Sequence, residues 1–286
     1  SAGGGGYAGT DLLDAAANLG ALADNGGPTQ THALLAGSAA LNAGNNATCE
    51  ATDQRGVARP LGAACDIGAL EQTANVFTVT NTNDSGAGTL RQALLDANAT
   101  ANLGGTPDAI YFNIAGAGVQ TIAPTTALPA VSEPVLIDGS TQPGASCAAW
   151  PPTLLIELDG SSAGAALALD LASGGNTVRG LVVNRFAYGI HIANSGGNTV
   201  ECNFLGTDAA GTTALGNGAA GVYVQQASTG NLIQGNLIAG NSDAQVQLVN
   251  FGSAPDNNVI ADNYIGVDAT GTTPLGGGSL FGAVYI

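Results

Sequence analysis

Three carboxylates stand where the sequence could support cleavage of a glycosidic bond. Asp138 and Asp159 each open an Asp-Gly-Ser turn and lie 21 residues apart, while Glu157 precedes the second turn on a strand. Glycosidases hold the scissile bond between two carboxylates that act as acid and as base or nucleophile. The sequence favours a structural reading, because an Asp before Gly-Ser commonly binds its own backbone and closes the turn. No catalytic residue is therefore assigned.

The basic residues do not support elimination chemistry. Polysaccharide lyases combine calcium-binding carboxylates with a Lys or Arg base; the chain contains no Lys, and Arg179 and Arg185 have no acidic cluster beside them in the sequence. His32 and His191 are far apart, and neither belongs to a Ser/His/Asp set. His191 lies in an alternating strand, so we expect it to point outward with a structural role.

Metal and cofactor sites are not expected. Asp208 and Asp268 occupy equivalent places in two near-identical insertions, which begin at Gly206 and Gly266. Each insertion has a single carboxylate, fewer than a calcium loop normally uses. No pair of cysteines has the spacing of a zinc site. We expect Asp208 and Asp268 to stabilise turns, and the two insertions to form a ridge on one face.

The charge balance limits the partners. Charged residues make up 9% of the 286 residues, and the net charge is −16. Nucleic acid, anionic membrane surfaces and acidic polysaccharides would be repelled, because binding them needs clustered Lys and Arg. No apolar run approaches the roughly 18 residues of a membrane-spanning helix. A hydrophobic content of 45% is nevertheless ample for a core.

The second half of the chain repeats itself. Four stretches begin with Asn at intervals of 22, 33 and 27 residues, and each is followed by a second short strand. Short strands, Gly/Asn corners and this period predict an all-β solenoid, a right-handed parallel β-helix. Expected inward positions are Val178, Leu181, Val200, Ile233, Ile238, Ile260 and Ile265. Expected asparagine ladders, with the amides at left-handed corners, are Asn176, Asn198, Asn231 and Asn258, and Asn203, Asn236 and Asn263.

One helix is expected near residues 88–98. Thr89 and Gln92 form a capping box, and Leu90, Ala93, Leu94 and Ala97 share one face. Such an amphipathic helix would cover the open apolar end of the first coil. Strands are expected at 77–80, 109–114, 135–138 and 155–158, before the clear repeats begin.

Residues 1–72 lack the coil repeat. The stretch from Asp24-Asn-Gly-Gly-Pro through Cys49 and Asp53-Gln-Arg-Gly to Cys65-Asp-Ile-Gly-Ala-Leu-Glu71 resembles the choice-of-anchor Q domain, over residues 24–71. That module is found at the C-terminal end of β-helices in bacterial surface proteins. Residues 73–286 resemble right-handed β-helix repeat domains of secreted bacterial proteins, through Thr89-Leu-Arg-Gln-Ala-Leu, Ile137-Asp-Gly-Ser and the two insertions.

Four cysteines suit two disulfides and an oxidising compartment. Cys49 and Cys65 enclose a short loop within the capping module, where a bond would contribute about 3 kcal/mol. Cys147 and Cys202 are the remaining pair and would link different coils. Within the module, Arg55 or Arg59 is expected to pair with Asp53 or another carboxylate and to fix the loop, rather than to bind a ligand.

Together these features predict an extracellular structural or adhesive surface protein. No Met precedes Ser1, which suggests a processed chain whose targeting segment has been removed. The capping module comes first and the chain stops in mid-coil at Ile286, which suggests head-to-tail assembly into a filament, or one repeat of a long fibrous protein. An enzyme is less expected. The alternative is a carbohydrate-active enzyme or a carbohydrate-binding β-helix, with carbohydrate or a host cell surface as partner.

Overall fold

The computed structural model describes residues 17–35, 38–250, 256–276 and 282–286. The chain divides into two compact units. The N-terminal unit comprises residues 1–75 with 103–106, and the β-unit comprises residues 76–102 with 107–286. The predicted module of residues 1–72 and the resemblance over 24–71 both include residues outside the described ranges.

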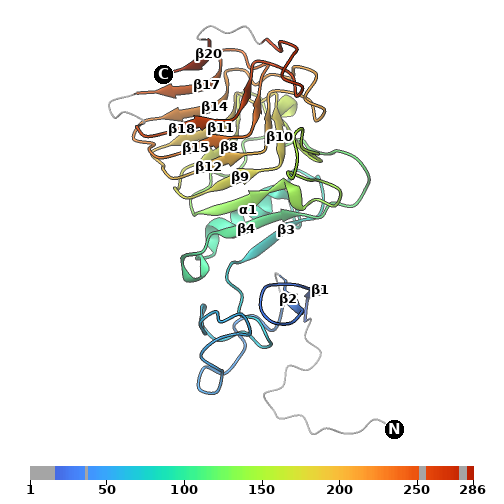
Figure 1. The fold of residues 1–286 in the computed structure, drawn as a ribbon, viewed down its shortest axis with the longest axis vertical. Coiled ribbons are helices and arrows are strands. Elements are labelled where there is room, and N and C mark those ends of the chain that lie inside the picture. Colours follow the sequence, from blue (N-terminus) through green and yellow to red (C-terminus); the bar gives the residue numbers. More distant parts are fainter. Residues whose placement is uncertain (1–16, 36–37, 251–255, 277–281) are drawn as a thin grey trace. The chain divides into compact units, whose positions relative to one another are not determined.

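Three parallel sheets make up the β-unit, and every strand pair within them is parallel (Figure 1). The seven-stranded sheet contains β3 (Val76–Val79), β4 (Asp108–Phe112), β6 (Val135–Asp138), β9 (Thr177–Arg179), β12 (Thr199–Glu201), β15 (Leu232–Gln234) and β18 (Val259–Ala261). The six-stranded sheet contains β5 (Gln120–Ile122), β7 (Ile156–Asp159), β10 (Leu181–Asn184), β13 (Phe204–Leu205), β16 (Leu237–Ile238) and β19 (Tyr264–Ile265). The five-stranded sheet contains β8 (Leu167–Leu171), β11 (Tyr188–Ala193), β14 (Ala220–Gln225), β17 (Ala244–Val249) and β20 (Gly282–Tyr285).

From β9 onward the chain visits the three sheets in a fixed order. It runs from the seven-stranded to the six-stranded and then to the five-stranded sheet, four times in succession. The prediction of a mostly β chain with parallel pairing is confirmed, and the arrangement is compatible with a parallel β-helix or solenoid.

Single residues with left-handed backbone make the corners. Cys202 has φ 55° and Asp262 has φ 55°, and both stand at the corner between the seven-stranded and six-stranded sheets, where Gly180 and Gly235 hold the equivalent places. Cys202, Gly235 and Asp262 each stand directly before a ladder asparagine, and the next strand begins one residue later, whereas Gly180 stands directly before Leu181. At these corners the left-handed residue precedes the ladder asparagine, and the sequence-based expectation that the asparagine itself adopts this conformation was wrong.

The core consists of apolar columns, each formed by residues in register on successive strands. Val178, Val200 and Ile233 are fully buried and pair in register across β9, β12 and β15. Leu181 and Ile238 are also fully buried, whereas Ile260 and Ile265 are partly buried and pack against the same cluster. Each fully buried Val, Leu or Ile contributes about 1.5–3 kcal/mol relative to exposure.

Asparagine side chains form continuous columns beside this core. In the first column each Nδ2 donates to the next Oδ1 at 2.8 Å, through Asn176, Asn198, Asn231 and Asn258. The second column runs through Asn203, Asn236 and Asn263 at 3.1 and 2.9 Å. Each acceptor Oδ1 also takes the backbone N–H of the asparagine one coil earlier. The side chains thereby satisfy backbone groups at corners that the sheet ladders cannot reach.

The sequence did not reveal a third column. Asn217 Nδ2 donates to Asn241 Oδ1 at 2.9 Å, and Asn241 Nδ2 donates to Gln245 Oε1 at 2.8 Å. This third column lies just before the strands of the five-stranded sheet. Insertions in that part of each coil make the spacing between equivalent residues irregular in the sequence.

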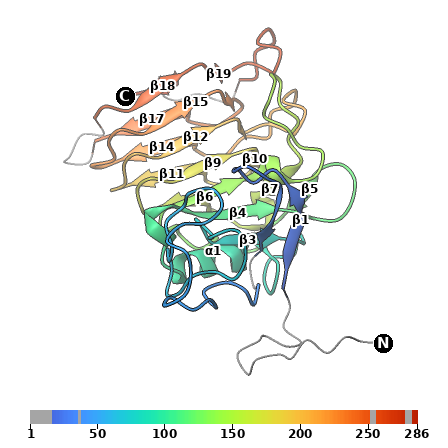
Figure 2. The same ribbon diagram turned by 60° about the horizontal axis from the view of Figure 1, so that its bottom comes forward.

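Helix α1 (Leu90–Ala99) lies beside β3 and β4, at the first strands of the stack (Figure 2). Thr89 is its N-cap and accepts a hydrogen bond from the Gln92 backbone N–H at 3.2 Å. The reciprocal half of the predicted capping box is replaced, because the Gln92 side chain donates to Asp96. The predicted apolar face is buried and joins the core, which confirms the helix and its orientation.

The N-terminal unit has a different organisation. Its strands β1 (Leu19–Ala23) and β2 (Thr31–Leu34) form an antiparallel pair. Most of its remaining described residues are turns and loops.

Candidate functional site

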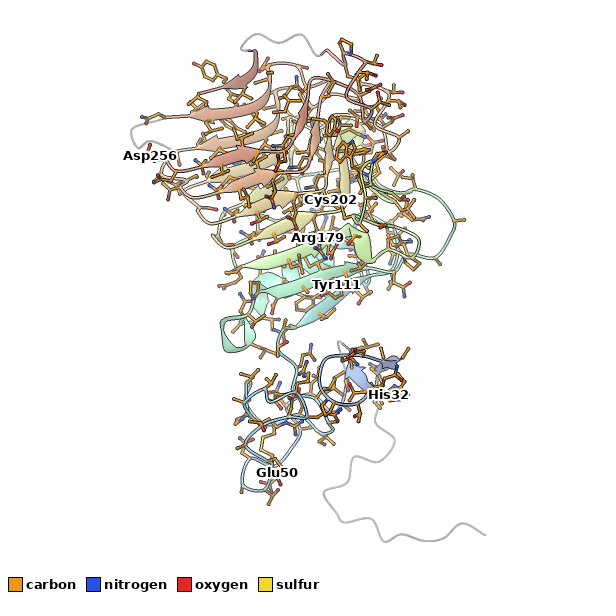
Figure 3. All side chains as sticks on the ribbon, in the orientation of Figure 1. His32, Glu50, Tyr111, Arg179, Cys202 and Asp256 are labelled. Atoms are coloured by element: carbon orange, nitrogen blue, oxygen red, sulfur yellow. A yellow bond between two sulfur atoms is a disulfide. The ribbon has the colours of Figure 1, made fainter. Side chains whose placement is uncertain are left out.

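A column of polar side chains runs along the outer face of the seven-stranded sheet. Tyr111, Asp138, Arg179, Glu201 and Gln234 are paired in register on β4, β6, β9, β12 and β15. Side chains alternate between the two faces of a strand, so a residue next to a core residue must point outward. Figure 3 labels Tyr111 and Arg179 on this face, with Cys202 just beyond. We call these five residues the polar column.

Charge-assisted hydrogen bonds link the column. Arg179 Nη2 donates to Asp138 Oδ2 at 2.7 Å, and Arg179 Nη1 lies 3.7 Å from Glu201 Oε1. Gln234 Nε2 donates to Glu201 Oε2 at 3.1 Å. The hydrogen bond to Asp138 raises the pKa of Arg179 above its usual value. Burial, reinforced by the Asp138 charge, raises the pKa of Tyr111.

Asp138 serves the turn and the arginine together. One carboxylate oxygen accepts from the backbone N–H of Ser140 at 2.9 Å and from its hydroxyl at 2.5 Å. The other oxygen accepts from Arg179, and the Asp138 side chain is only 4% exposed. With both oxygens engaged and almost no surface, Asp138 is placed to orient Arg179 and not to reach a substrate.

A groove of about 420 Å³ opens beside the polar column. Arg179, Glu201, Gln234 and Asp262 line one side. The other side is a loop that contains Trp150 and Pro152 and is tied to the sheet by the Cys147–Cys202 disulfide. Both predicted disulfides are present, the second being Cys49–Cys65 in the N-terminal unit.

Trp150 is fixed in place on the outside of the six-stranded sheet. Its indole stacks on Tyr264 with ring centroids 4.4 Å apart and an interplanar angle of 6°, and it lies 6.0 Å from Phe204. The indole N–H donates to the carbonyl of Ala269 at 2.8 Å. These residues belong to a second apolar cluster with Leu237. The groove therefore has a rigid apolar wall.

The carboxylates considered from the sequence do not come together as a pair. Asp138 lies on the seven-stranded sheet, whereas Asp159 and Glu157 lie on β7 of the six-stranded sheet. Asp159 accepts from the Ser161 backbone N–H at 2.9 Å, as the turn reading predicted. Glu157 accepts from Thr121 at 2.7 Å and from Asn184 at 2.9 Å.

The expectation that Arg179 and Arg185 lack acidic neighbours was wrong. Arg179 lies between Asp138 and Glu201, as described above. Arg185 Nε lies 3.2 Å from Asp159 Oδ1, and its Nη2 lies 4.0 Å from Glu157 Oε1. Adjacent coils supply these partners, so they are distant in sequence.

A repeat-based signal for the column was available. Arg179, Glu201 and Gln234 each stand three residues after a ladder asparagine. Aligning the repeats on those asparagines places the three side chains on one line.

Both histidines are held by contacts with neighbouring residues of their own unit. His191 Nδ1 lies 2.8 Å from Asp170 Oδ1, its Nε2 lies 2.8 Å from the Gln225 amide, and its ring lies 5.5 Å from that of Tyr223. Tyr223 also stacks on Tyr188 at 4.6 Å. In the N-terminal unit, His32 Nδ1 lies 2.8 Å from the carbonyl of Gly20.

The two insertions are turns closed by their aspartates. Asp208 accepts from the backbone N–H groups of Thr212 and Thr213 at 2.8 and 3.0 Å. Asp268 accepts from the Thr270 hydroxyl at 2.6 Å, and this bond with neighbouring N–H groups holds the pKa of Asp268 far below its usual value. The insertions touch, because Ala269 N–H donates to the Gly211 carbonyl at 2.8 Å. Among the described residues no group of three or more His, Cys, Asp or Glu side chains could hold a metal ion.

Buried ion pairs organise the N-terminal unit. Asp53 accepts from Arg55 Nε and Nη2 at 2.8 and 2.7 Å and from the Glu71 backbone N–H at 2.9 Å. Burial works against ionisation here, but the hydrogen bonds from Glu71, Arg55 and Val57 outweigh it and lower the pKa of Asp53 to about 2. Arg59 Nε lies 3.5 Å from Glu71 Oε2. These contacts fix the loop, as the sequence suggested.

Comparison with known proteins adds no family to this geometry: no family model and no curated protein matches the chain. The resemblance to a choice-of-anchor Q domain thus stays a prediction. Within the described ranges, no helix has both the length and the apolar character needed to cross a bilayer.

Proposed function

We propose that this chain is an extracellular structural or adhesive surface protein, built on a right-handed parallel β-helix. The fixed order in which the chain visits three parallel sheets supports this architecture. The N-terminal unit is proposed to be its choice-of-anchor-Q-like capping module. Two disulfides fit an oxidising compartment outside the cell.

The asparagine columns are the observation that carries the structural role. Asn198 and Asn231 are each bonded to the coil before and the coil after, and both are almost fully buried. Such continuous pairing joins every coil to its neighbours and leaves few points where a protease could open the chain.

End-to-end contact is the proposed mode of assembly. Exposed large apolar side chains are concentrated in two places among the described residues. Leu19, Leu22 and Ile67 are 47%, 55% and 44% exposed in the N-terminal unit, and Val259 and Tyr285 are 50% and 39% exposed on β18 and β20. Apolar surface at a sheet edge favours association, whether with a second copy or with further coils of a longer polypeptide.

Electron microscopy of the concentrated protein tests this assembly. We expect particles joined end to end, and we expect Leu22→Asp or Val259→Asp to separate them. Leu95→Asp is the matched control, because Leu95 is 46% exposed on α1 and belongs to neither of these two groups of residues. Assembly that survives both substitutions, or that Leu95→Asp disrupts equally, would contradict the proposal.

A carbohydrate-related function is the second candidate, and the groove beside the polar column favours it. Asp138 is not placed to act in hydrolysis, because both of its oxygens are engaged. The carboxylates that line the groove are Glu201, which accepts from Gln234, and Asp262. We propose binding without turnover as the form of this second candidate. Release of reducing ends from a polysaccharide by the purified protein would instead establish an enzyme.

A further inference from the structure

The floor of the groove offers hydrogen-bond donors and acceptors in alternation. Successive strands lie about 4.8 Å apart, so Arg179, Glu201 and Gln234 present a guanidinium, a carboxylate and an amide at regular intervals. The next residue in register is Ala261, and Asp262 lines the groove from the exposed corner that follows it. A ligand made of rings with several hydroxyl groups can match such a row, because each hydroxyl both donates and accepts.

Arg179 has one nitrogen, Nη1, that is not engaged in a hydrogen bond to Asp138 or Glu201. Its Nη2 is bonded to Asp138, but its Nη1 is 3.7 Å from Glu201, beyond hydrogen-bonding distance, and is the donor that a ligand could engage, whereas its Nε is buried. The side chain is 39% exposed to the groove side of the sheet. Asp138 holds the guanidinium in one orientation, which lowers the entropy that a ligand would otherwise have to overcome.

The charges of the groove select against anions. One cation, Arg179, stands against the carboxylates of Asp138, Glu201 and Asp262. Phosphate, sulfate or uronate groups would meet a net negative surface on a chain whose net charge is −16. An uncharged ligand suffers no such penalty.

The position of the groove on a sheet face disfavours extended peptides as ligands. Extended peptides commonly bind by adding a strand to a sheet edge, where backbone groups are free. This groove lies on the face of a sheet, over the side chains of Arg179, Glu201 and Gln234 and beside an apolar wall of Trp150 and Pro152. A pyranose ring has an apolar face for such a wall and a rim of hydroxyl groups for the floor.

We infer that the groove between the Trp150 loop and Arg179, Glu201 and Gln234 binds a neutral saccharide. This inference rests on the proposed adhesive function and names its ligand class and its site. The volume of about 420 Å³ lies within the range of small-ligand sites. No covalent step is involved.

Fluorescence of the single tryptophan, with calorimetry as a second readout, tests the inference on the whole chain. The probes are neutral gluco-, manno- and galacto-oligosaccharides, with oligogalacturonate as the acidic comparison. We expect at least one neutral probe to shift Trp150 emission and to bind more tightly than the acidic probe. Gln234→Ala and Arg179→Gln should weaken that binding about tenfold each.

Arg185→Gln is the matched control, because Arg185 is 40% exposed and paired with two carboxylates but follows β10 of the six-stranded sheet and does not line the groove. It should leave binding unchanged. Should Arg179→Gln fail to fold, Gln234→Ala alone decides. Absence of binding by every neutral probe, preference for oligogalacturonate, or unchanged binding in Gln234→Ala would overturn the inference. Assembly seen by microscopy is independent of these results, so loss of binding with assembly intact leaves the structural proposal standing.

Discussion

The N-terminal unit concentrates its long-range contacts on a few charged groups, whereas the β-unit spreads them over columns of identical neutral residues. Asp53 alone accepts hydrogen bonds from the Arg55 side chain and from three backbone N–H groups. In the β-unit, Asn198 makes the same bonds that Asn231 makes one coil later. The comparison teaches that one unit depends on ionisation and the other on shape and repetition.

Removal of each disulfide should show the largest effects. In the chain-entropy view, Cys147–Cys202, with 55 residues of separation, contributes about 4 kcal/mol, and Cys49–Cys65, with 16, about 3 kcal/mol. Denaturant unfolding of the two double Cys→Ala variants measures this. Trp150 emission reports the β-unit and hydrogen exchange reports the N-terminal unit. Equal losses in both units from either variant would break the comparison.

Asn198→Ala should cost about 3 kcal/mol. The change removes the acceptor for the backbone N–H and Nδ2 of Asn176 and leaves buried donors without partners. Thermal unfolding measures the loss. Asn83→Ala, in an exposed loop, is the control and should change stability by less than about 0.5 kcal/mol. If Asn198→Ala lowered the stability no more than Asn83→Ala does, the asparagine column would not be needed for the stability of the β-unit.

Acid should weaken the N-terminal unit through Asp53. The pKa of Asp53 in the folded chain, about 2, is below its usual value of 3.8, so its contribution of about 2 kcal/mol is present above pH 4 and disappears as pH falls through 2. Burial raises the pKa of Asp66, which acts with the opposite sign. Hydrogen exchange of the N-terminal unit, measured at several pH values for the wild type and for Asp53→Asn, isolates the contribution of Asp53. If the stability of the two proteins falls equally steeply with pH, the prediction is wrong.

Trp150→Phe should have the smallest effect, about 1 kcal/mol. Phenylalanine keeps much of the contact with Tyr264 but cannot donate to the Ala269 carbonyl. Calorimetric unfolding measures the difference. A loss above about 3 kcal/mol would mean that the loop supports the whole stack and not only the groove wall.

Repetition made much of the β-unit predictable. The spaced asparagines located two columns, and the alternation of apolar residues located the core. Contacts that occur only once could not be predicted from the repeats. Trp150 contacts Tyr264 and Ala269, which lie more than 100 residues later in the chain. No pattern in the sequence predicts that the Trp150 loop packs on later coils.

The polar column was missed for a different reason. Its charged members were considered as separate residues, so Arg179 was judged without Asp138, which is 41 residues away, and without Glu201 on the next coil. The register of the parallel strands places these residues side by side, although they are far apart in the sequence. The groove depends on two further contacts of the Trp150 loop. The Cys147–Cys202 bond was predicted from the sequence, but the stacking of Trp150 on Tyr264 was not.

The contact between the two insertions limits how such a chain can lengthen by gene duplication. Gly211 and Ala269 meet over a coil that has a short corner, and a Cβ added at Gly211 would lie 2.7 Å from the Ala269 Cβ. Copying a single insertion-bearing coil would place two insertions on adjacent strands, where they would compete for one space. Copying a pair of coils, one long and one short, repeats the arrangement without conflict. The unit of duplication is then two coils, although the strand order repeats with every coil.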